Sequence, residues 1–531
     1  MTSTAAEREQ HHLTRRAGVV AAGTLLSRTL GLGRDVVIAG LFSAAATDAW
    51  NVAFAIPNVL RQLFAEGAIQ AAVLPVLTKV REVEGDAAAR RFFRELRGLS
   101  LCLLFGSVLL AVIFAPGLVA LFAPGYVGDP AQLERTIQLT RAVFPYVFFT
   151  GSAALGLAAL NAHQRFVATS FSPALLNVTF ISCSFGLPGL IATWGADPVF
   201  ALAVAAVVGG LLQAVSQWPS LATIGYLEVP TLRIRSRAVR ETLSRMGPVL
   251  LSMGIYYLHV IIARRFLSEL GVGAQSYFSW ALRLCDFPQG IFVLALQTAT
   301  LPSLSKLAAR GQHGDLGRTF AFSMRLGLFL SIAASALFIG LAEPLVALLF
   351  QRGAFGAIAT RETALALMAQ ALGIWTLAAV RQLSSAYYAL GDTRTPLLVG
   401  VLDLIAFAIL ALWLQSGLGH VGVGLAISAA RALQMLALWT ILQRRIPTLP
   451  TRQIAAAALR ALGCGALAAW IAREAAALVA NAGRPGAVAL ALPGLLGSVV
   501  FVAVLLSVAR LTRSKELAAL GRMMFRLHRV D

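Results

Sequence analysis

The sequence predicts an all-α polytopic membrane protein with fourteen transmembrane helices, and three observations support this prediction. The 531 residues are 58% hydrophobic and only 13% charged, whereas soluble globular chains carry about 25% charged residues. Apolar stretches of about 20 residues, long enough to cross a bilayer, recur from end to end. Because the backbone must satisfy its own hydrogen bonds in hydrocarbon, and these stretches are too long for barrel strands, we expect helices.

The first apolar stretch follows Arg15 and Arg16 and could be mistaken for a secretory signal peptide. Arg28, Arg34 and Asp35 soon interrupt it, and no convincing small-residue cleavage site follows, so we interpret it as a retained first helix. The predicted ends of the spans are accurate only to within several residues. The fourteen spans are 17–42, 48–78, 98–122, 136–160, 167–194, 198–224, 246–268, 274–304, 320–350, 362–389, 396–414, 420–442, 454–480 and 486–509.

Basic residues alternate between the two sets of loops that these spans define. One set, which includes both termini, holds 29 Lys and Arg residues, and the intervening set holds 7. Because cytoplasmic loops are enriched in Lys and Arg, both termini are predicted to be cytoplasmic. This topology also explains the net charge of +20 better than nucleic-acid binding does, since the chain carries no RNA- or DNA-binding motif.

An internal repeat relates the two halves of the chain. Residues 74–79 (LPVLTK) recur 227 residues later as residues 301–306 (LPSLSK). Residues 116–122 (PGLVALF) resemble residues 344–350 (PLVALLF), 228 residues later. The offset spans six helices, an even number, so both halves have the same orientation in the membrane. Parallel repeats of six helices are typical of transporters.

The repeat also predicts the domain organisation. Arg165, after the fourth span, corresponds to Arg394, after the tenth. Two parallel six-helix lobes are therefore followed by an appended helix pair and a basic cytoplasmic tail. We predict an N-lobe at 1–224, a C-lobe at 225–443 and the appended region at 444–531.

The cysteines indicate neither a disulfide framework nor a metal site. All four lie in apolar surroundings, without a CxxC motif or a Cys/His spacing. We interpret them as small packing residues and predict no metal and no cofactor. They are Cys102, Cys183, Cys285 and Cys464.

Of the 44 Lys and Arg residues, 36 are assigned to the two sets of loops and the span ends beside them, which leaves eight within the spans, all of them arginine. An unpaired charge at mid-bilayer costs at least about 2.5–3.5 kcal/mol, so such residues usually face a cavity or a partner. For Arg141, Arg325 and Arg431, snorkelling to the interface is an equal alternative. The eight are Arg28, Arg34, Arg61, Arg141, Arg283, Arg325, Arg381 and Arg431.

The first span differs from most others in carrying two of these arginines. The sequence SRTLGLGRD at 27–35 places Arg28 and Arg34 around a Gly-x-Gly, and the glycines permit a kink. A phosphate-binding loop is not indicated, because such loops follow a strand and none is predicted here.

The second and eighth spans carry polar residues next to proline. Pro57 breaks the hydrogen-bond ladder of the second span, and Asn58 and Arg61 share one face. In the eighth span, Arg283 precedes Asp286 and Pro288.

Together these arginines could converge on a central cavity. The planar fork of arginine donors suits phosphate, so the set favours an anionic, phosphorylated substrate. The alternative is that the arginines form ion pairs with Asp35, Asp48 and Asp286, and that these pairs hold the two lobes together.

Five segments together resemble the MurJ (MviN) family, and the resemblance runs over nearly the whole chain. Members are lipid II flippases of the multidrug/oligosaccharidyl-lipid/polysaccharide exporter superfamily. The segments are SRTLGLGRD (27–35), TDAWNVAFAIPNVLRQLFAEGA (47–68), LRLCDFPQGI (282–291), FQRGAF (350–355) and YYALGDTRTP (387–396).

The resemblance implies fourteen helices and transport by alternating access in the bacterial inner membrane. The implied substrate is undecaprenyl-pyrophosphoryl-MurNAc-pentapeptide-GlcNAc, moved from the cytoplasmic to the periplasmic leaflet for peptidoglycan synthesis. Implied partners are lipid II, membrane lipids and the peptidoglycan synthesis and cell division machinery.

The resemblance also implies roles for individual residues. One set would bind the pyrophosphate and headgroup, another would supply polar cavity or gate positions, and the last two helices would form a groove for the polyprenyl tail. The binding set is Arg28, Arg34, Arg61, Arg283 and Asn58, and the polar set is Ser27, Asp35, Asp48, Glu66, Asp286 and Arg381.

Some members of the family have a cation site in the second lobe. Here Asp403 is the only obvious candidate, with Val399 one turn before it, so protons and membrane potential remain alternatives to sodium. We interpret His259, alone in the seventh span, as a packing residue.

Three rival functions were weighed against a flippase. A related exporter of drugs or another lipid-linked glycan would share the fold, but cationic drugs would favour an acidic cavity. A membrane glycosyltransferase or phosphatase would need paired carboxylates, a histidine-based nucleophile or metal ligands, which the longest loops lack. A structural scaffold would leave the mid-span charges unexplained. We therefore expect a transporter and not an enzyme.

Overall fold

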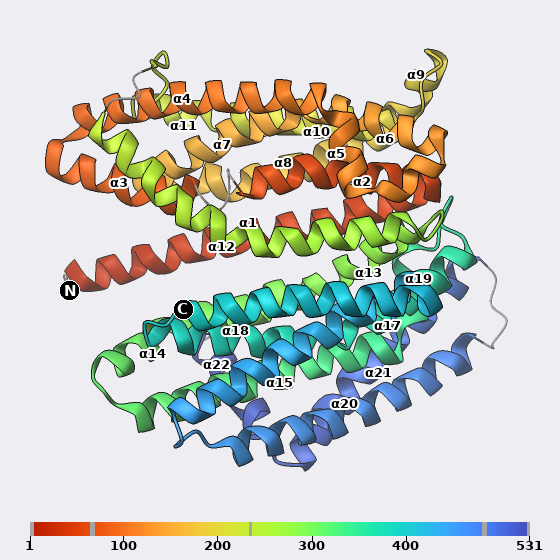
Figure 1. Cartoon of the computed structure of the whole chain (residues 1–531). Coiled ribbons are helices and arrows are strands. Elements are labelled where there is room, and N and C mark those ends of the chain that lie inside the picture. The colour runs from red at the N-terminus through yellow and green to blue at the C-terminus, as the bar shows by residue number, and fades with distance from the viewer. Residues whose placement is uncertain (1–4, 64–68, 233–235, 481–485, 528–531) are drawn as a thin grey trace. The chain divides into compact units, whose positions relative to one another are not determined.

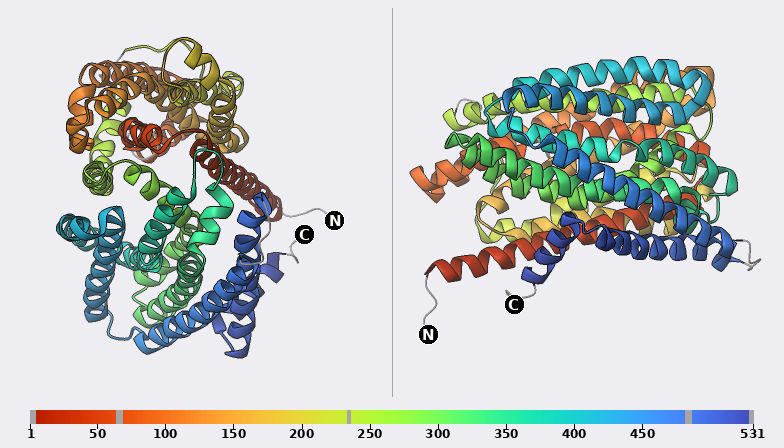
Figure 2. Two further views of the ribbon diagram at one scale, coloured as in Figure 1. Left: turned by 90° about the vertical axis from the view of Figure 1, so that its right-hand side faces the viewer. Right: turned by 90° about the horizontal axis from the view of Figure 1, so that it is seen from below.

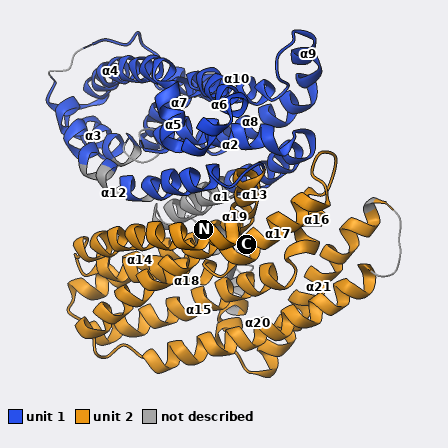
Figure 3. Cartoon of the chain, turned by 45° about the vertical axis from the view of Figure 1, so that its right-hand side comes forward, with its two compact units in different colours: residues 1–272 blue, residues 273–531 orange. Residues whose placement is uncertain are grey.

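The chain forms helices throughout the parts that the structure, a computed structural model, describes (Figure 1). These are residues 5–63, 69–232, 236–480 and 486–527, and they contain no β-strand. The helices group into two compact units, residues 1–272 and residues 273–531 (Figure 3). The predicted all-α fold is confirmed.

Unit 1 consists of helices whose starts are set by proline and by capping side chains. Proline is the first residue of α6, α7 and α9, a position where its missing N–H costs nothing. The unit comprises α1 (Ala5–Leu41), α2 (Ala44–Arg61), α3 (Ile69–Glu84), α4 (Asp86–Ile113), α5 (Ala115–Phe122), η2 (Pro124–Gly128), α6 (Pro130–Val143), α7 (Pro145–Ala162), α8 (Phe166–Gly186), α9 (Pro188–Thr193), α10 (Phe200–Val215), α11 (Trp218–Thr223) and α12 (Arg237–Ser268).

Unit 2 contains the helices that follow, including the appended pair. Within it, α20 packs against both α21 and α15 (Figures 1 and 2). The elements are α13 (Ala274–Pro288), the π-helical turn η3 (Gln289–Val293), α14 (Leu294–Ala309), α15 (His313–Gly340), α16 (Ala342–Phe350), α17 (Ala357–Ala371), α18 (Ile374–Ala389), α19 (Arg394–Arg445), α20 (Thr451–Ala480), α21 (Ala487–Leu511) and α22 (Lys515–Leu527).

Unit 2 contains the break expected between the spans 396–414 and 420–442, and one further helix. Within α19, two helical segments meet at a kink at Gly419, whose φ of 56° and ψ of −137° are not helical. The tail after the last span contains α22, a helix that was not predicted.

Nine helices in the described residues are long and apolar enough to cross a membrane. They account for ten of the predicted spans, because α19 covers two. Within the described residues, the helices at the first, second, seventh and eighth predicted spans are not among the nine. The structure therefore supports a multi-pass membrane protein, and the count of fourteen stays a prediction.

The internal repeat is visible in the helices and in their turns. Helices α4 and α15 both have 28 residues and begin 227 residues apart. A π-helical turn begins at Gln62 and another at Gln289, again 227 residues later. Such turns often mark functional segments, because they insert one extra residue into the helical ladder.

The turns after α7 and α18 share one backbone hydrogen-bond pattern. Arg165 N donates to Leu160 O over 2.8 Å, and Asp392 N donates to Tyr387 O over 2.9 Å. The backbone therefore aligns Arg165 with Asp392, whereas the sequence comparison had aligned Arg165 with Arg394.

The compact units and the predicted lobes divide the chain differently. By packing, α12 belongs to unit 1, where it contacts α3 and α5. The predicted division at 1–224, 225–443 and 444–531 follows the sequence repeat, and it stays a prediction.

Candidate functional site

The polar motif of the first span lies on α1, where α1 packs closely against α8. A Cβ atom at Gly23 would lie 2.5 Å from the carbonyl oxygen of Ser170, so only glycine permits this approach. The motif 27–35 begins one helical turn beyond this contact. Its residues Ser27, Gly31 and Arg34 face Asn177 of α8. The geometry thus places the Ser27–Asp35 segment beside the middle of α8.

Arg34 is held by three groups of unit 1. Its Nε and Nη2 donate to Asp35 Oδ1 over 2.9 and 2.6 Å, and its Nη1 donates to Asn177 Oδ1 over 3.1 Å. Its Cζ lies 5.4 Å from the centre of the Phe180 ring, a cation–π distance. The Arg34 and Asp35 side chains are only 13% and 6% exposed, so solvent screens this pair weakly.

Two other residues of the motif behave differently from Arg34. Ser27 accepts a hydrogen bond at its backbone oxygen from Asn177 Nδ2, over 3.0 Å. Arg28 is half-buried and has no hydrogen-bond or ion-pair partner within the described part of the chain.

The second span places Asn58 and Arg61 together, as predicted from their spacing. Arg61 Nε and Nη2 donate to Asn58 Oδ1 over 3.1 and 3.0 Å. These two bonds orient the Arg61 guanidinium, which also has a further interaction partner. Asp48, on the same helix, is fully buried and has a polar partner. Glu66 lies outside the described residues.

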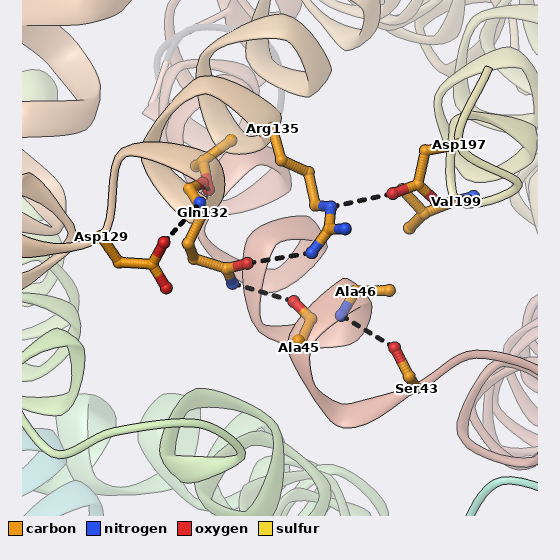
Figure 4. A network of polar contacts seen from close by, with 9 residues as sticks. Ser43, Ala45, Ala46, Asp129, Gln132, Arg135, Asp197 and Val199 are labelled. Carbon is orange, nitrogen blue, oxygen red and sulfur yellow. Dashed lines mark hydrogen bonds and ion pairs between the residues drawn. The ribbon is translucent and has the colours of Figure 1, made fainter. Parts of the chain in front are cut away.

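A polar network fixes the start of α2 against its neighbours (Figure 4). Gln132 Nε2 donates to the carbonyl oxygen of Ala45 over 2.9 Å, and Arg135 Nη1 donates to Gln132 Oε1 over 3.2 Å. Arg135 Nε also donates to Asp197 Oδ2 over 2.8 Å. Ser43 caps α2 by accepting from Ala46 N. The helix that carries Asn58 and Arg61 is thereby fixed at its first turn.

The predicted site residues of unit 2 lie on α13, α18 and α19. Arg283 and Asp286 are exposed on α13, Arg381 is half-buried on α18, and each of the three has an interaction partner. Asp403 is 4% exposed, and its Oδ2 lies 3.7 Å from Nε of Arg431, whose side chain is 15% exposed. The geometry therefore gives Asp403 an arginine as counter-ion, and its role as a cation ligand stays a prediction.

The other arginines of the predicted spans fall into two classes. Arg141 is exposed and donates from Nε to the carbonyl oxygen of Val112 over 3.3 Å, in keeping with a snorkelling side chain. Arg325 instead lies 3.6 Å from Glu516 Oε1 and is mostly buried. His259 Nδ1 lies 3.2 Å from the carbonyl oxygen of Ile255, one turn earlier.

Sequence reasoning missed two residues that hold Arg34. Asn177 and Phe180 lie on α8, in a span that was read only for its hydrophobicity. The available signal was the asparagine itself, because an amide inside an apolar span usually hydrogen-bonds to a neighbouring helix. Within unit 1 the structure thus brings together Ser27, Arg34 and Asp35 around Asn177.

Comparisons with known proteins give one consistent result. The model of the family described as "Lipid II flippase MurJ" matches residues 38–494. The chain is 32% identical over 443 residues to the lipid II flippase MurJ of Burkholderia cenocepacia, covering 82% of this chain and 84% of that protein. It is also 32% identical over 430 residues to the probable lipid II flippase MurJ of Vibrio cholerae, covering 79% and 81%.

Solved structures share the fold. A structure titled "Lipid II flippase MurJ, inward closed conformation" matches with a TM-score of 0.74 at 22% identity, covering 92% of this chain and 98% of that one. An inward-facing multidrug transporter of the MATE family matches with a TM-score of 0.66 at 17% identity, covering 80% and 96%. At these identities, both matches bear on the fold alone.

Proposed function

Because this chain belongs to the lipid II flippase MurJ family, we propose that it moves lipid II from the cytoplasmic to the periplasmic leaflet for peptidoglycan synthesis. The single observation that carries the proposal is the match of the family model to residues 38–494. Relatives named as lipid II flippases, at about 30% identity over about 80% of the chain, support the same function.

The charges of unit 1 support an anionic headgroup as the cargo. Arg28 has no partner within the described residues, and the amide of Asn58 is one of the groups that orient Arg61. A guanidinium that stays charged and keeps N–H groups available suits bidentate binding of phosphate oxygens. In the proposal, Arg28, Arg34 and Arg61 of unit 1 and Arg283 of unit 2 bind the pyrophosphate during the cycle.

The remaining polar positions take supporting roles in this proposal. Asp35 and Asn58 orient arginines, and Arg283 acts beside Asp286. Ser27, Asp48, Glu66 and Arg381 are proposed as cavity or gate positions on the strength of the family motif alone. The helix pair α20 and α21 is proposed to accommodate the polyprenyl tail.

We also propose where the protein lies in the cell and that it catalyses no covalent reaction. The Lys and Arg bias of the loops supports cytoplasmic termini, and the relatives support the bacterial inner membrane. Transport by alternating access requires no covalent step, so we propose that the protein is not an enzyme. Peptidoglycan synthesis and cell division proteins are the proposed protein partners.

Complementation in a flippase-depleted bacterium tests the proposal. Alanine at Arg28, Arg34, Arg61 or Arg283, with membrane expression checked, should each reduce growth strongly. Arg141→Ala is the matched control, because this arginine lies inside a predicted span but is exposed. If the wild-type chain fails to restore growth, the function is wrong. If it restores growth and all four alanine variants do so equally well, only the assigned residues are wrong.

The main alternative, export of another lipid-linked glycan, is separated by the cargo. Purified protein reconstituted in liposomes should translocate lipid II and not a polyprenyl-pyrophosphate that carries an unrelated sugar. Equal rates for the two lipids would favour the alternative.

A further inference from the structure

We propose that Asn177 of α8 is a positioning residue for Arg34, so that lipid II binding depends on an asparagine outside the motif of the first span. This inference rests on the proposed function, because it assumes that Arg34 contacts the anionic headgroup. The residue is 143 positions away from Arg34 in the sequence and reaches it only through the packing of α1 on α8.

The amide of Asn177 joins two turns of α1. Its Nδ2 donates to the carbonyl oxygen of Ser27 over 3.0 Å, and its Oδ1 accepts from Arg34 Nη1 over 3.1 Å. Between these two contacts, Gly31 presents no side chain, and its Cα region lies against the amide, with a hypothetical Cβ 3.7 Å from Nδ2. Asn177 is 7% exposed, so both bonds form away from bulk water. The single amide of Asn177 thus fixes both the backbone of α1 at Ser27 and the guanidinium of Arg34.

Only a neutral amide satisfies both contacts at this position. Leucine has a similar volume but offers neither donor nor acceptor. Aspartate could accept from Arg34 but could not donate to Ser27, and its charge would compete with an anionic ligand. Asparagine supplies one donor and one acceptor without altering the charge of the site.

The contacts leave part of Arg34 available to a ligand. Arginine has five N–H donors. Asp35 takes one from Nε and one from Nη2, and Asn177 takes one from Nη1. One N–H on each terminal nitrogen is left, which matches the two donors of a bidentate phosphate contact. Without Asn177, Nη1 loses its fixed partner and the guanidinium can rotate away from this orientation.

Phe180 supports the same orientation from the next turn of α8. Its ring lies under the Arg34 guanidinium and also contacts Trp50 and Phe54 of α2, with ring centroids 5.8 and 6.0 Å apart. Asn177 and Phe180 therefore hold Arg34 from one side of α8, and the aromatic contacts extend from there to the helix of Arg61.

A double-mutant cycle on lipid II affinity tests the proposal. Purified protein is titrated with lipid II for the wild type, Asn177→Leu, Arg34→Ala and the double variant. We expect roughly tenfold weaker binding for Asn177→Leu and no further loss when it is added to Arg34→Ala, because residues that act through one another are not additive. Thr179→Val is the control, since Thr179 is also buried on α8 but bonds only within its own helix, to Leu175 O.

Each contrary outcome has a separate meaning. If Asn177→Leu weakens binding equally with and without Arg34, its role is structural and the proposal is overturned. If Arg34→Ala weakens binding but Asn177→Leu does not, the proposal fails while the proposed function stands. If Arg34→Ala has no effect, the assigned site fails, and the positioning role falls with it. Should the leucine variant not fold, Asn177→Ser removes the same two contacts with a small polar side chain and is measured in the same cycle.

Discussion

The arginines of the two units are held in different ways. In unit 1, Arg61 is bound by the neutral amide of Asn58, and Arg28 has no described partner. In unit 2, Arg431 and Arg325 face the carboxylates of Asp403 and Glu516. Arg34 lies between these cases, because it binds both the carboxylate of Asp35 and an amide.

This difference teaches that one helical architecture uses buried arginine for two purposes. An arginine paired with a distant carboxylate joins two elements and loses its net charge. An arginine with no partner among the described residues, such as Arg28, keeps its charge, which costs stability in a low-dielectric environment but leaves it able to bind an anion. We therefore expect substitutions of the carboxylate-paired Arg431 and Arg325 to affect stability first, and substitution of Arg28 to affect transport first.

The largest stability effect is expected at the Asp403–Arg431 pair of unit 2. Arg431→Leu removes the arginine that faces the buried Asp403 carboxylate, and breaking such a buried pair costs about 3 kcal/mol or more. Replacing both residues by leucine should be less destabilising than the worse single substitution, because no charge is stranded. Thermal unfolding of the purified protein measures both.

The same experiment addresses the predicted cation site. Since Arg431 already faces Asp403, replacing sodium by potassium should leave the wild-type unfolding temperature unchanged. A sodium-dependent increase in the wild type would show that an external cation, and not Arg431, balances this carboxylate.

A smaller effect is expected where α22 meets α15. Glu516 is 5% exposed and lies 3.6 Å from Arg325, which is 17% exposed. Glu516→Ala should lower the free energy of unfolding by about 2 kcal/mol, because Arg325 loses its partner in a partly buried position. The control is Asp315→Ala, since the Asp315–Arg318 pair is largely exposed and should contribute less than about 1 kcal/mol. Equal losses in the two variants would contradict the distinction.

The turn between α18 and α19 predicts an acid-sensitive contribution that the equivalent turn of unit 1 lacks, because Arg165 stands there in place of Asp392. Hydrogen bonds from Thr395 and the nearby Arg445 guanidinium lower the pKa of Asp392 from 3.8 to about 2. Because the pKa is lower in the folded state, the ionised carboxylate stabilises the folded protein at pH values above about 4. This stabilisation is lost as the pH falls from about 4 to about 2. The contribution should be on the order of 1 kcal/mol, because water reaches the turn.

Asp392→Asn tests this effect. The variant should be less stable than the wild type at pH 7 and should approach it near pH 2. Arg165→Ala is the control at the equivalent position of unit 1, where no carboxylate is present. If the free energy of unfolding changes with pH in the same way for Asp392→Asn and the wild type, Asp392 makes no acid-sensitive contribution to stability.

Much of the fold and part of the candidate site could be predicted from the sequence. The contacts that could not be predicted have a common physical cause. Apolar length predicted the helices, and the spacing of Asn58 and Arg61 predicted their contact, because both depend on residues within one helix. The pairs Asn177–Arg34 and Glu516–Arg325 join helices far apart in the chain, so no local pattern indicates them. The break between the spans 396–414 and 420–442 could be predicted, and the structure places a non-helical residue, Gly419, within it.

The smallest effect is expected at the two equivalent turns themselves. Gln164 and Gly391 both have positive φ, 57° and 76°, at the same place in the shared hydrogen-bond pattern. A side chain in this region costs about 1–2 kcal/mol, whereas glycine costs about 0.5–1 kcal/mol through the entropy of the unfolded chain. Gln164→Gly should therefore stabilise the protein by about 0.5 kcal/mol.

The reverse substitution should have the opposite sign. A Cβ at Gly391 would meet no described atom within 4 Å, so Gly391→Gln acts through the backbone angle alone and should destabilise by about 0.5 kcal/mol. The two changes are measured as shifts of one unfolding transition, and the double variant should match the wild type. If both variants shift in the same direction, the turns are not equivalent, and the repeat does not extend to the backbone between the helices.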